Sequence, residues 1–198
     1  MNIQSLDTKL LLLINHGTAN SLFDILMPAL SQRGYLLIIP FLLAMFLRGT
    51  RQKDKMGKTF LTPAIWTIAV SICALSFADL VQYTMKHAIA RLRPCLVIEG
   101  IRLIITCPSS YSMPSSHAIG SFAAALPLFY LTQKYIALIW RLYPLLLASL
   151  IAFSRIYLGV HYPSDALAGA LLGAIIGLVL SSLYQLMETR ENVKQNRR

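Results

Sequence analysis

The sequence predicts an all-α protein: a polytopic transmembrane helical bundle with five spans, or six in an alternative interpretation. Of its 198 residues, 56% are hydrophobic and only 13% are charged. The mean hydropathy is +0.61, and long apolar stretches alternate with connections rich in Lys and Arg. Soluble domains of this length usually carry more charge. We therefore expect one membrane-embedded domain over residues 1–198.

The five predicted spans follow one another without a linker or an internal repeat. A helix needs about 20 residues to cross ~30 Å of hydrocarbon, and the second and fifth spans are long enough. The first span is short and contains Pro40. The predicted spans are Tyr35–Leu47, Pro63–Met85, Ser116–Thr132, Leu142–Leu158 and Ser164–Met187.

Residues 5–31 precede the first predicted span. They contain two short apolar runs, Leu10–Ile14 and Leu22–Leu30, with a polar stretch between them. Neither run reaches the length of a span. We expect N-terminal interfacial helices that lie along the membrane surface, and the alternative is a sixth span.

The basic residues predict the orientation of the bundle. If the spans alternate, three connections that hold eleven of the eighteen Lys and Arg residues fall on one side, which should be cytoplasmic. These residues are Arg48, Arg51, Lys53, Lys55, Lys58, Lys134, Arg141, Arg190, Lys194, Arg197 and Arg198. The net charge of +10 thus reflects topology, and we expect no nucleic-acid partner, because these residues do not line one face among aromatics.

The first polar motif, at the outer end of the second span, contains Lys86, Arg93 and Pro94. The two cations lie seven residues apart, so we expect them near one face of a helix that Pro94 ends. A lysine gives a point charge and an arginine a planar fork, and both bind phosphate oxygens. The alternative is that they are anchors at the membrane surface.

The second motif, Pro114-Ser115-Ser116-His117, opens the third span. The unpaired N–H groups in the first turn of a helix can bind an anion, and the serine hydroxyls can add donors. His117 could protonate a leaving alkoxide. The alternative roles are a helix cap for the serines and a structural hydrogen bond for the histidine.

The third motif joins the fourth and fifth spans. Arg155 ends the fourth span, Gly159 breaks it, and His161 and Asp165 stand at the start of the fifth. A carboxylate beside a histidine fixes the tautomer of the ring and leaves the other nitrogen free to attack phosphorus. The alternative is a structural His–Asp or Arg–Asp pair.

The three motifs together supply three cations and two imidazoles on the non-cytoplasmic side. These groups can hold a phosphate and hydrolyse its ester, and their place at the ends of spans suggests a lipid phosphate. The predicted site has one carboxylate among several cations, so we expect no bound metal.

Other residues predict structural features. Gly169, Gly173 and Gly177 recur every four residues along the fifth span and indicate close packing against another helix. Asp79 lies within the second span, where we expect a buried hydrogen bond or salt bridge, although an acid inside the membrane is also a candidate for function.

The three cysteines divide into two groups. Cys95 and Cys107 share one outer loop, where they either form a disulfide or remain two thiols. We expect Cys73, in the second span, to be a buried small apolar residue.

The order and spacing of the three motifs resemble the type 2 phosphatidic acid phosphatase superfamily. That family shows Lys, six residues and Arg-Pro, then Pro-Ser-Gly-His, then Ser-Arg, five residues, His, three residues and Asp. The corresponding residues here, within residues 86–165, are Lys86, Arg93, Pro94, Pro114, Ser115, Ser116, His117, Ser154, Arg155, His161 and Asp165. Ser116 replaces the usual glycine and would be strained if the position needs a positive φ.

The resemblance implies a lipid phosphatase of the bacterial inner membrane, with its active site facing the periplasm or exterior and with no cofactor or metal. Its substrate would be undecaprenyl diphosphate, phosphatidylglycerol phosphate, phosphatidic acid or a lipid A phosphate. His161, supported by Asp165, would attack phosphorus, and His117 would protonate the leaving group. The residues that would bind the phosphate are Lys86, Arg93, Ser115, Ser116 and Arg155.

Two other functions are compatible with parts of this pattern. A membrane transporter or channel could hold an anion at its helix termini, but it should show paired repeats and charges near mid-bilayer, of which only Asp79 is found. A vanadate-dependent haloperoxidase shares the motifs in a soluble helical protein, so the predicted spans disfavour it. The oligomeric state is left open.

Overall fold

The computed structural model describes residues 3–52 and 59–195, and these residues contain helices and no β-strand. The chain is an all-α, polytopic transmembrane bundle, as predicted. The elements are α1 (Ile3–Gly17), α2 (Ser21–Arg33), the 3₁₀ helix η1 (Gly34–Ile38), α3 (Ile39–Arg51), α4 (Leu61–Ile89), α5 (Pro94–Val97), α6 (Ser116–Leu131), α7 (Leu138–Tyr157) and α8 (Pro163–Gln195).

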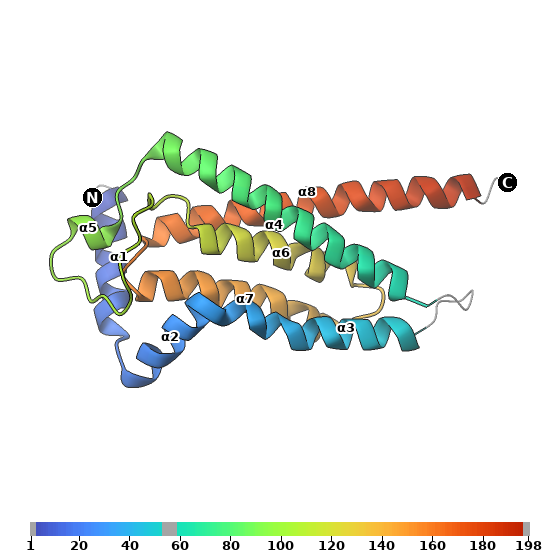
Figure 1. The fold of residues 1–198 in the computed structure, drawn as a ribbon, viewed down its shortest axis with the longest axis horizontal. Coiled ribbons are helices and arrows are strands. Elements are labelled where there is room, and N and C mark those ends of the chain that lie inside the picture. The colour runs from blue at the N-terminus through green and yellow to red at the C-terminus, as the bar shows by residue number, and fades with distance from the viewer. Residues whose placement is uncertain (1–2, 53–58, 196–198) are drawn as a thin grey trace.

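The long helices run along a common direction, and α6 lies at the centre of the bundle, packed against α4, α7 and α8 (Figure 1). The first helix, α1, lies across one end, close to where α4 ends and α8 begins. This position agrees with the interfacial helix predicted for the N-terminus.

Four helical segments are long and apolar enough to cross a membrane: Ser21–Arg51, Leu61–Val97, Leu138–Tyr157 and Pro163–Lys194. The third predicted span forms α6, a shorter apolar helix of 16 residues.

The first span begins earlier than predicted. Residues 22–30 were expected in an interfacial helix, but α2, η1 and α3 form one continuous apolar segment. Asn20 starts this segment, because its side chain accepts a hydrogen bond from the Phe23 amide at 2.9 Å. Pro40 does not interrupt it, because this proline lies in the first turn of α3, where no amide hydrogen is needed.

The basic connections lie at the opposite end of the bundle from the three motifs. The end of α3, the α6–α7 connection and the end of α8 all lie there (Figure 1). The described basic residues of these parts are Arg48, Arg51, Lys134, Arg141, Arg190 and Lys194. Lys53, Lys55, Lys58, Arg197 and Arg198 lie outside the described residues.

The glycines of α8 let it approach α6 closely, as predicted. A Cβ atom at Gly169 would lie 2.7 Å from the Ser115 carbonyl oxygen, and one at Gly177 would lie 2.6 Å from the Leu126 Cβ atom. Gly173 packs against the Ile119 carbonyl in the same way. This packing places the start of α8 beside the start of α6, where two motifs meet.

The predictions for Cys73 and Asp79 were wrong, since both side chains are exposed. Asp79 makes no ion pair among the described residues and lines a cavity. The buried side of α4 is a narrow stripe of small residues spaced by three and four, to which neither residue belongs. That stripe consists of Ala64, Thr67, Ser71, Ala74 and Ala78.

Candidate active site

The first motif is divided between a helix and the loop that follows it. Lys86 lies in the last turn of α4, and Ala90 ends that helix with a φ of 49°. Arg93 therefore lies beyond the helix, just before α5, and the prediction of a shared helix face was wrong. Pro94 was expected to end α4 but instead begins α5. The turn at Ala90 brings Arg93 back over the bundle, where its side chain is 3% exposed.

The third motif is built on a tight turn between α7 and α8. Gly159 has a φ of +73° and faces Ile101 of the outer loop, so a Cβ atom would not fit there. The turn directs His161 into the protein, where it is 1% exposed. Its Nδ1 atom lies 3.5 Å from Oδ2 of Asp165, which is fully buried. The structure therefore pairs the two residues that the spacing of the motif predicts.

Asp165 is held by several donors in addition to His161. Its Oδ2 atom accepts hydrogen bonds from the Ser112 hydroxyl at 2.5 Å and from the Tyr162 amide at 2.9 Å. Its Oδ1 atom accepts one from Arg91 at 2.6 Å. A carboxylate with this many donors has a fixed orientation, and Oδ2 is turned towards the imidazole.

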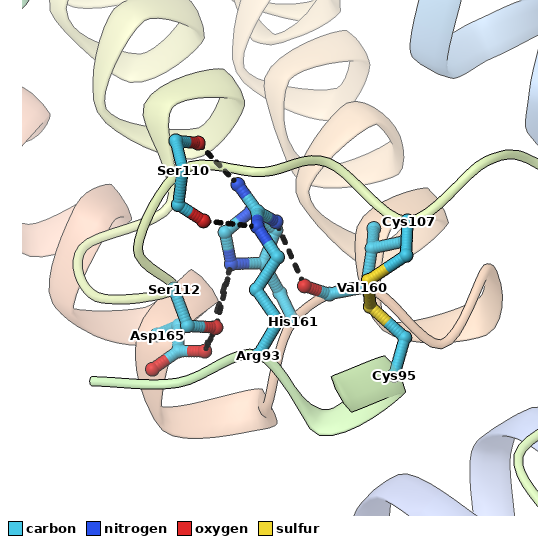
Figure 2. Close-up of a disulfide and its surroundings, with 8 residues drawn as sticks. All are labelled: Arg93, Cys95, Cys107, Ser110, Ser112, Val160, His161 and Asp165. Carbon is cyan, nitrogen blue, oxygen red and sulfur yellow. Dashed lines mark hydrogen bonds and ion pairs between the residues drawn. A yellow bond between two sulfur atoms is a disulfide. The ribbon is translucent and has the colours of Figure 1, made fainter. Parts of the chain in front are cut away.

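Arg93 joins the nucleophile candidate to the outer loop (Figure 2). Its Nη1 atom donates to the Val160 carbonyl at 2.8 Å and lies 2.9 Å from Nε2 of His161. Its Nε and Nη2 atoms donate to the carbonyl and hydroxyl of Ser110. Because Nδ1 faces Asp165, Nε2 is the nitrogen with a free electron pair. Attack through Nε2 requires that Arg93 release this nitrogen and turn its N–H group to the phosphate.

Lys86 and Arg155, which are both 5% exposed, form a cluster of three buried cations together with Arg93. Lys86 donates to the Tyr111 carbonyl, and Arg155 donates to the Ser31 hydroxyl. Among the described residues, Lys86, Arg93 and Arg155 form no ion pair with a carboxylate. Buried cations without a paired anion are costly, so this cluster suits an anionic ligand.

The second motif places two serines beside this cluster. The Ser115 hydroxyl is buried and has no hydrogen-bond partner among the described residues. Ser116 is the first residue of α6 and has no positive φ, so the serine is not strained where the family has glycine. Its hydroxyl donates to Gln82 at 2.8 Å. Ser115 therefore has a free donor for an anion, whereas the Ser116 hydroxyl is already engaged.

The two imidazoles differ in burial, but the same cations interact with both. His161 is buried, whereas the His117 side chain is exposed. Arg93 and Arg155 interact electrostatically with both rings. Burial, and then these two positive charges, lower the pKa of His161 to about 3, although Asp165 acts against them. The His161 ring is therefore neutral at neutral pH, as a nucleophile must be.

A cavity of about 540 Å³ begins at His117 and extends along the bundle between α4, α6, α7 and the α2–η1 segment. Ser31, Asp79 and Ser116 add polar groups to its lining. The remaining walls are mainly apolar, and they include Leu75, Leu128, Leu147, Ala148 and Ile151.

Four polar residues at the site are absent from the predicted set: Asp7, Arg91, Ser110 and Ser112. The last two lie in the loop between α5 and α6, which has no periodic pattern, and the disulfide between Cys95 and Cys107 ties this loop to α5. Arg91 stands two residues before Arg93, and only this nearness could have indicated it.

No group of three or more His, Cys, Asp or Glu residues in the described part of the chain is arranged to hold a metal ion. The carboxylate at the site is surrounded by Arg91, His161, Ser112 and the Tyr162 amide.

A family model described as the PAP2 superfamily matches residues 61–188, which include all three motifs. The chain belongs to the PAP2 superfamily.

Similar proteins include two curated relatives and a solved structure. The first is an undecaprenyl-diphosphatase of Sulfolobus acidocaldarius, 36% identical over 94 residues, which are 48% of this chain and 44% of that protein. The second is a lipid A 4'-phosphatase of Bacteroides thetaiotaomicron, 27% identical over 185 residues, which are 88% of this chain and 75% of that protein. The match spans about half the length of the first curated relatives.

The third is a solved structure with the same fold. It is the crystal structure of a transmembrane PAP2 type phosphatidylglycerolphosphate phosphatase from Bacillus subtilis, with a TM-score of 0.67 and 19% sequence identity. The superposition covers 92% of this chain and 86% of that one.

Proposed function

We propose that this protein is an integral membrane lipid phosphatase that hydrolyses a lipid phosphate monoester or diphosphate through a phosphohistidine intermediate, without a metal. The observation that carries the proposal is the cluster of Lys86, Arg93 and Arg155, which are buried without an ion-pair partner among the described residues. A phosphate would supply the missing negative charge. The Ser115 hydroxyl is buried and has no hydrogen-bond partner among the described residues, so it would add a donor to the phosphate.

In the first step, Nε2 of His161 attacks phosphorus and forms a P–N bond. The P–O bond to the leaving group breaks, and its electron pair goes to the leaving oxygen, which His117 protonates. The leaving group is the lipid alcohol from a monoester and the lipid monophosphate from a diphosphate. The ring of His161 becomes positively charged, and Asp165, which faces Nδ1, stabilises this charge.

In the second step, His117 takes a proton from water, and the water oxygen attacks phosphorus. The P–N bond breaks, its electrons return to Nε2, and orthophosphate leaves. The three buried cations lower the barrier of both steps, because they offset the charge on the phosphoryl oxygens.

The apolar cavity supports a lipid substrate. It begins at His117, the proposed proton donor to the leaving group, and continues along the bundle between helices that have apolar walls. The leaving group of a lipid phosphate would therefore lie beside His117, with the first part of its chain in the cavity.

The candidate substrates are undecaprenyl diphosphate, phosphatidylglycerol phosphate, phosphatidic acid and the phosphates of lipid A, and we favour undecaprenyl diphosphate. In support, a relative named as an undecaprenyl-diphosphatase is 36% identical to this chain over 94 residues. The basic connections at the opposite end of the bundle favour an inner-membrane protein whose site faces the periplasm or exterior.

The test is release of orthophosphate by the purified protein in detergent, with a chelator present, from each of these four substrates. Wild type should release phosphate, and His161→Ala should lower the rate by about 1,000-fold or more, as loss of a catalytic nucleophile does. With a ³²P-labelled substrate, His117→Ala should accumulate an acid-labile phosphoprotein that His161→Ala cannot form.

His87→Ala is the matched control, because His87 lies next to Lys86 but is exposed and hydrogen-bonds to the Tyr83 carbonyl. It should retain wild-type activity. Phosphate release that needs an added divalent metal would contradict the metal-independent mechanism. If no substrate is cleaved but an anion crosses liposomes that contain the protein, it is a transporter.

A further inference from the structure

Arg91 links the first helix of the chain to the carboxylate of the active site. Its Nη1 atom donates to Asp165 Oδ1 at 2.6 Å and to the Ser164 hydroxyl at 2.7 Å. Its Nη2 atom donates to Oδ2 of Asp7, in α1, at 2.7 Å. The guanidinium also lies over the Tyr162 ring, 3.9 Å from its centre. Arg91 is thus fixed on several sides.

Asp7 is an unusual residue for an interfacial helix, because only 5% of it is exposed. Besides Arg91, it accepts hydrogen bonds from both the amide and the hydroxyl of Ser164, in the first turn of α8. An acidic group in this position binds the N–H groups that begin a helix. Asp7 therefore ties α1 to the part of α8 that carries Asp165.

Charges of opposite sign alternate along the contacts from Asp7 to Arg91 to Asp165, and Asp165 faces the neutral ring of His161. As His161 attacks phosphorus, its ring becomes positive, and an ionised Asp165 with Oδ2 held towards Nδ1 lowers the energy of that state. Arg91 holds Oδ1 and so prevents the carboxylate from rotating. Asp7 in turn balances the charge of Arg91, so that the guanidinium does not cancel the effect of Asp165 on the imidazole.

We propose that Arg91 and Asp7 are positioning residues of the phosphatase, which act by orienting Asp165 for His161. The proposal rests on the function proposed above and extends the active site to α1. Residue 7 lies outside the region that the family model matches, residues 61–188. The site is thus completed by a helix that the three motifs do not include.

A positioning role changes kcat and leaves KM nearly unchanged, because neither residue contacts Lys86, Arg93 or Arg155 in the phosphate cluster. We expect Arg91→Met to lower kcat by about 10- to 100-fold, the effect of removing the partners that orient metal-binding histidines. Arg91→Lys keeps the positive charge but not the planar guanidinium, so it should lower kcat by less than Arg91→Met does. Asp7→Asn should lower kcat by less than Arg91→Met does.

The experiment measures kcat, KM and thermal stability of each variant with a lipid phosphate that the wild type cleaves. Asp24→Asn is the matched control, because Asp24 also joins an N-terminal helix to an outer arginine, Arg102, without contacting Asp165. We expect Asp24→Asn to lower stability and leave kcat unchanged. The double variant Asp7→Asn/Arg91→Met should lose no more kcat than Arg91→Met alone, since both residues act through one contact.

The outcomes separate this proposal from the proposed function. If wild type is inactive on every lipid phosphate, both fall. If wild type is active and His161→Ala is not, but folded Arg91→Met and Asp7→Asn keep the wild-type kcat, only the positioning role is overturned. Equal losses of stability and kcat in Asp7→Asn and Asp24→Asn would show that the contacts are merely structural. If Arg91→Met does not fold, Arg91→Lys and Asp7→Asn decide the question.

Discussion

The two ends of the bundle use their arginines in opposite ways. At the end of α3, Arg48 and Arg51 are exposed, and the interior beside them is an apolar cluster that includes Met45. At the other end, Arg93 and Arg155 are 3% and 5% exposed, and the interior is a network of hydrogen bonds between α1, the outer loop, α7 and α8.

This difference shows what the basic residues are for. An exposed arginine at the end of a span keeps its hydration and affects only orientation in the membrane. A buried arginine has lost that hydration, and neighbouring carbonyls or an anion must compensate. Burial of the cations therefore distinguishes an anion-binding end from an end whose charge only reflects topology, which a count of Lys and Arg does not.

Substitution of one arginine at each end of the bundle tests whether burial identifies the anion-binding end. Arg155→Met should lower phosphatase activity by about 100-fold or more, the typical effect of losing one group that stabilises charge in a transition state. Arg141→Met, at the other end, should leave activity unchanged, because Arg141 donates to the Phe129 carbonyl and lies over the Phe129 ring, away from the three motifs.

The measurement is orthophosphate release together with thermal unfolding in detergent. Arg155→Met should not be less stable than wild type, because it removes a buried cation that has no ion-pair partner among the described residues. Wild-type activity in Arg155→Met would show that this buried cation does not bind the phosphate of the substrate.

A second comparison concerns the cysteines. The bond between Cys95 and Cys107 closes the outer loop whose later residues Ser110 and Ser112 hold Arg93 and Asp165. Cys95→Ser should lower the free energy of unfolding by about 2 kcal/mol, because the unfolded loop gains freedom. Cys73→Ser, on the exposed side of α4, should change it by less than about 0.5 kcal/mol.

Denaturant unfolding in detergent, with and without a reductant, measures both effects. The reductant should destabilise wild type and Cys73→Ser, and it should leave Cys95→Ser unaffected. A wild type that is insensitive to complete reduction would contradict a stabilising role of the disulfide.

The stability of the protein should depend on pH through His161. Burial lowers the pKa of His161 from 6.5 to about 3, so between these values the unfolded chain binds a proton that the folded protein does not. The contribution of His161 to stability is therefore fully present above pH 6.5 and is lost as the pH falls. Over one pH unit this loss is at most about 1.4 kcal/mol.

Replacing His161 with a group that does not titrate isolates this effect. The stability difference between wild type and His161→Gln should shift against wild type as the pH falls from 6.5 to 5.5, measured by thermal unfolding in detergent. A difference that stays constant with pH would show that the buried ring does not resist protonation.

The sequence predicted the parts of the molecule that depend on local patterns. Apolar length located the helices, and the four-residue step from His161 to Asp165 predicted their contact, because a turn followed by the start of a helix fixes this distance. The glycine repeat of α8 predicted its close packing against α6, since small side chains allow backbones to approach.

The remaining parts depend on tertiary contacts that have no local signal. Ala90 ends α4, although alanine is a good helix former, so the separation of Arg93 from the helix could not be predicted. Asp7 and Ser112 reach Arg91 and Asp165 across 84 and 53 residues of chain. A single sequence does not reveal which distant polar residues meet in a buried site.

The free thiol of Cys73 is a site for a probe that measures the depth of the protein in its bilayer. It lies 13 positions before Lys86 on the same helix, which corresponds to ~20 Å along the axis. A spin label attached there would report how far the thiol is from the lipid midplane. If Cys73 lies near that plane, the ammonium of Lys86 stands at the level of the headgroups, since half of a ~30 Å hydrocarbon layer is ~15 Å. A lipid would then meet the cations without being lifted out of its leaflet.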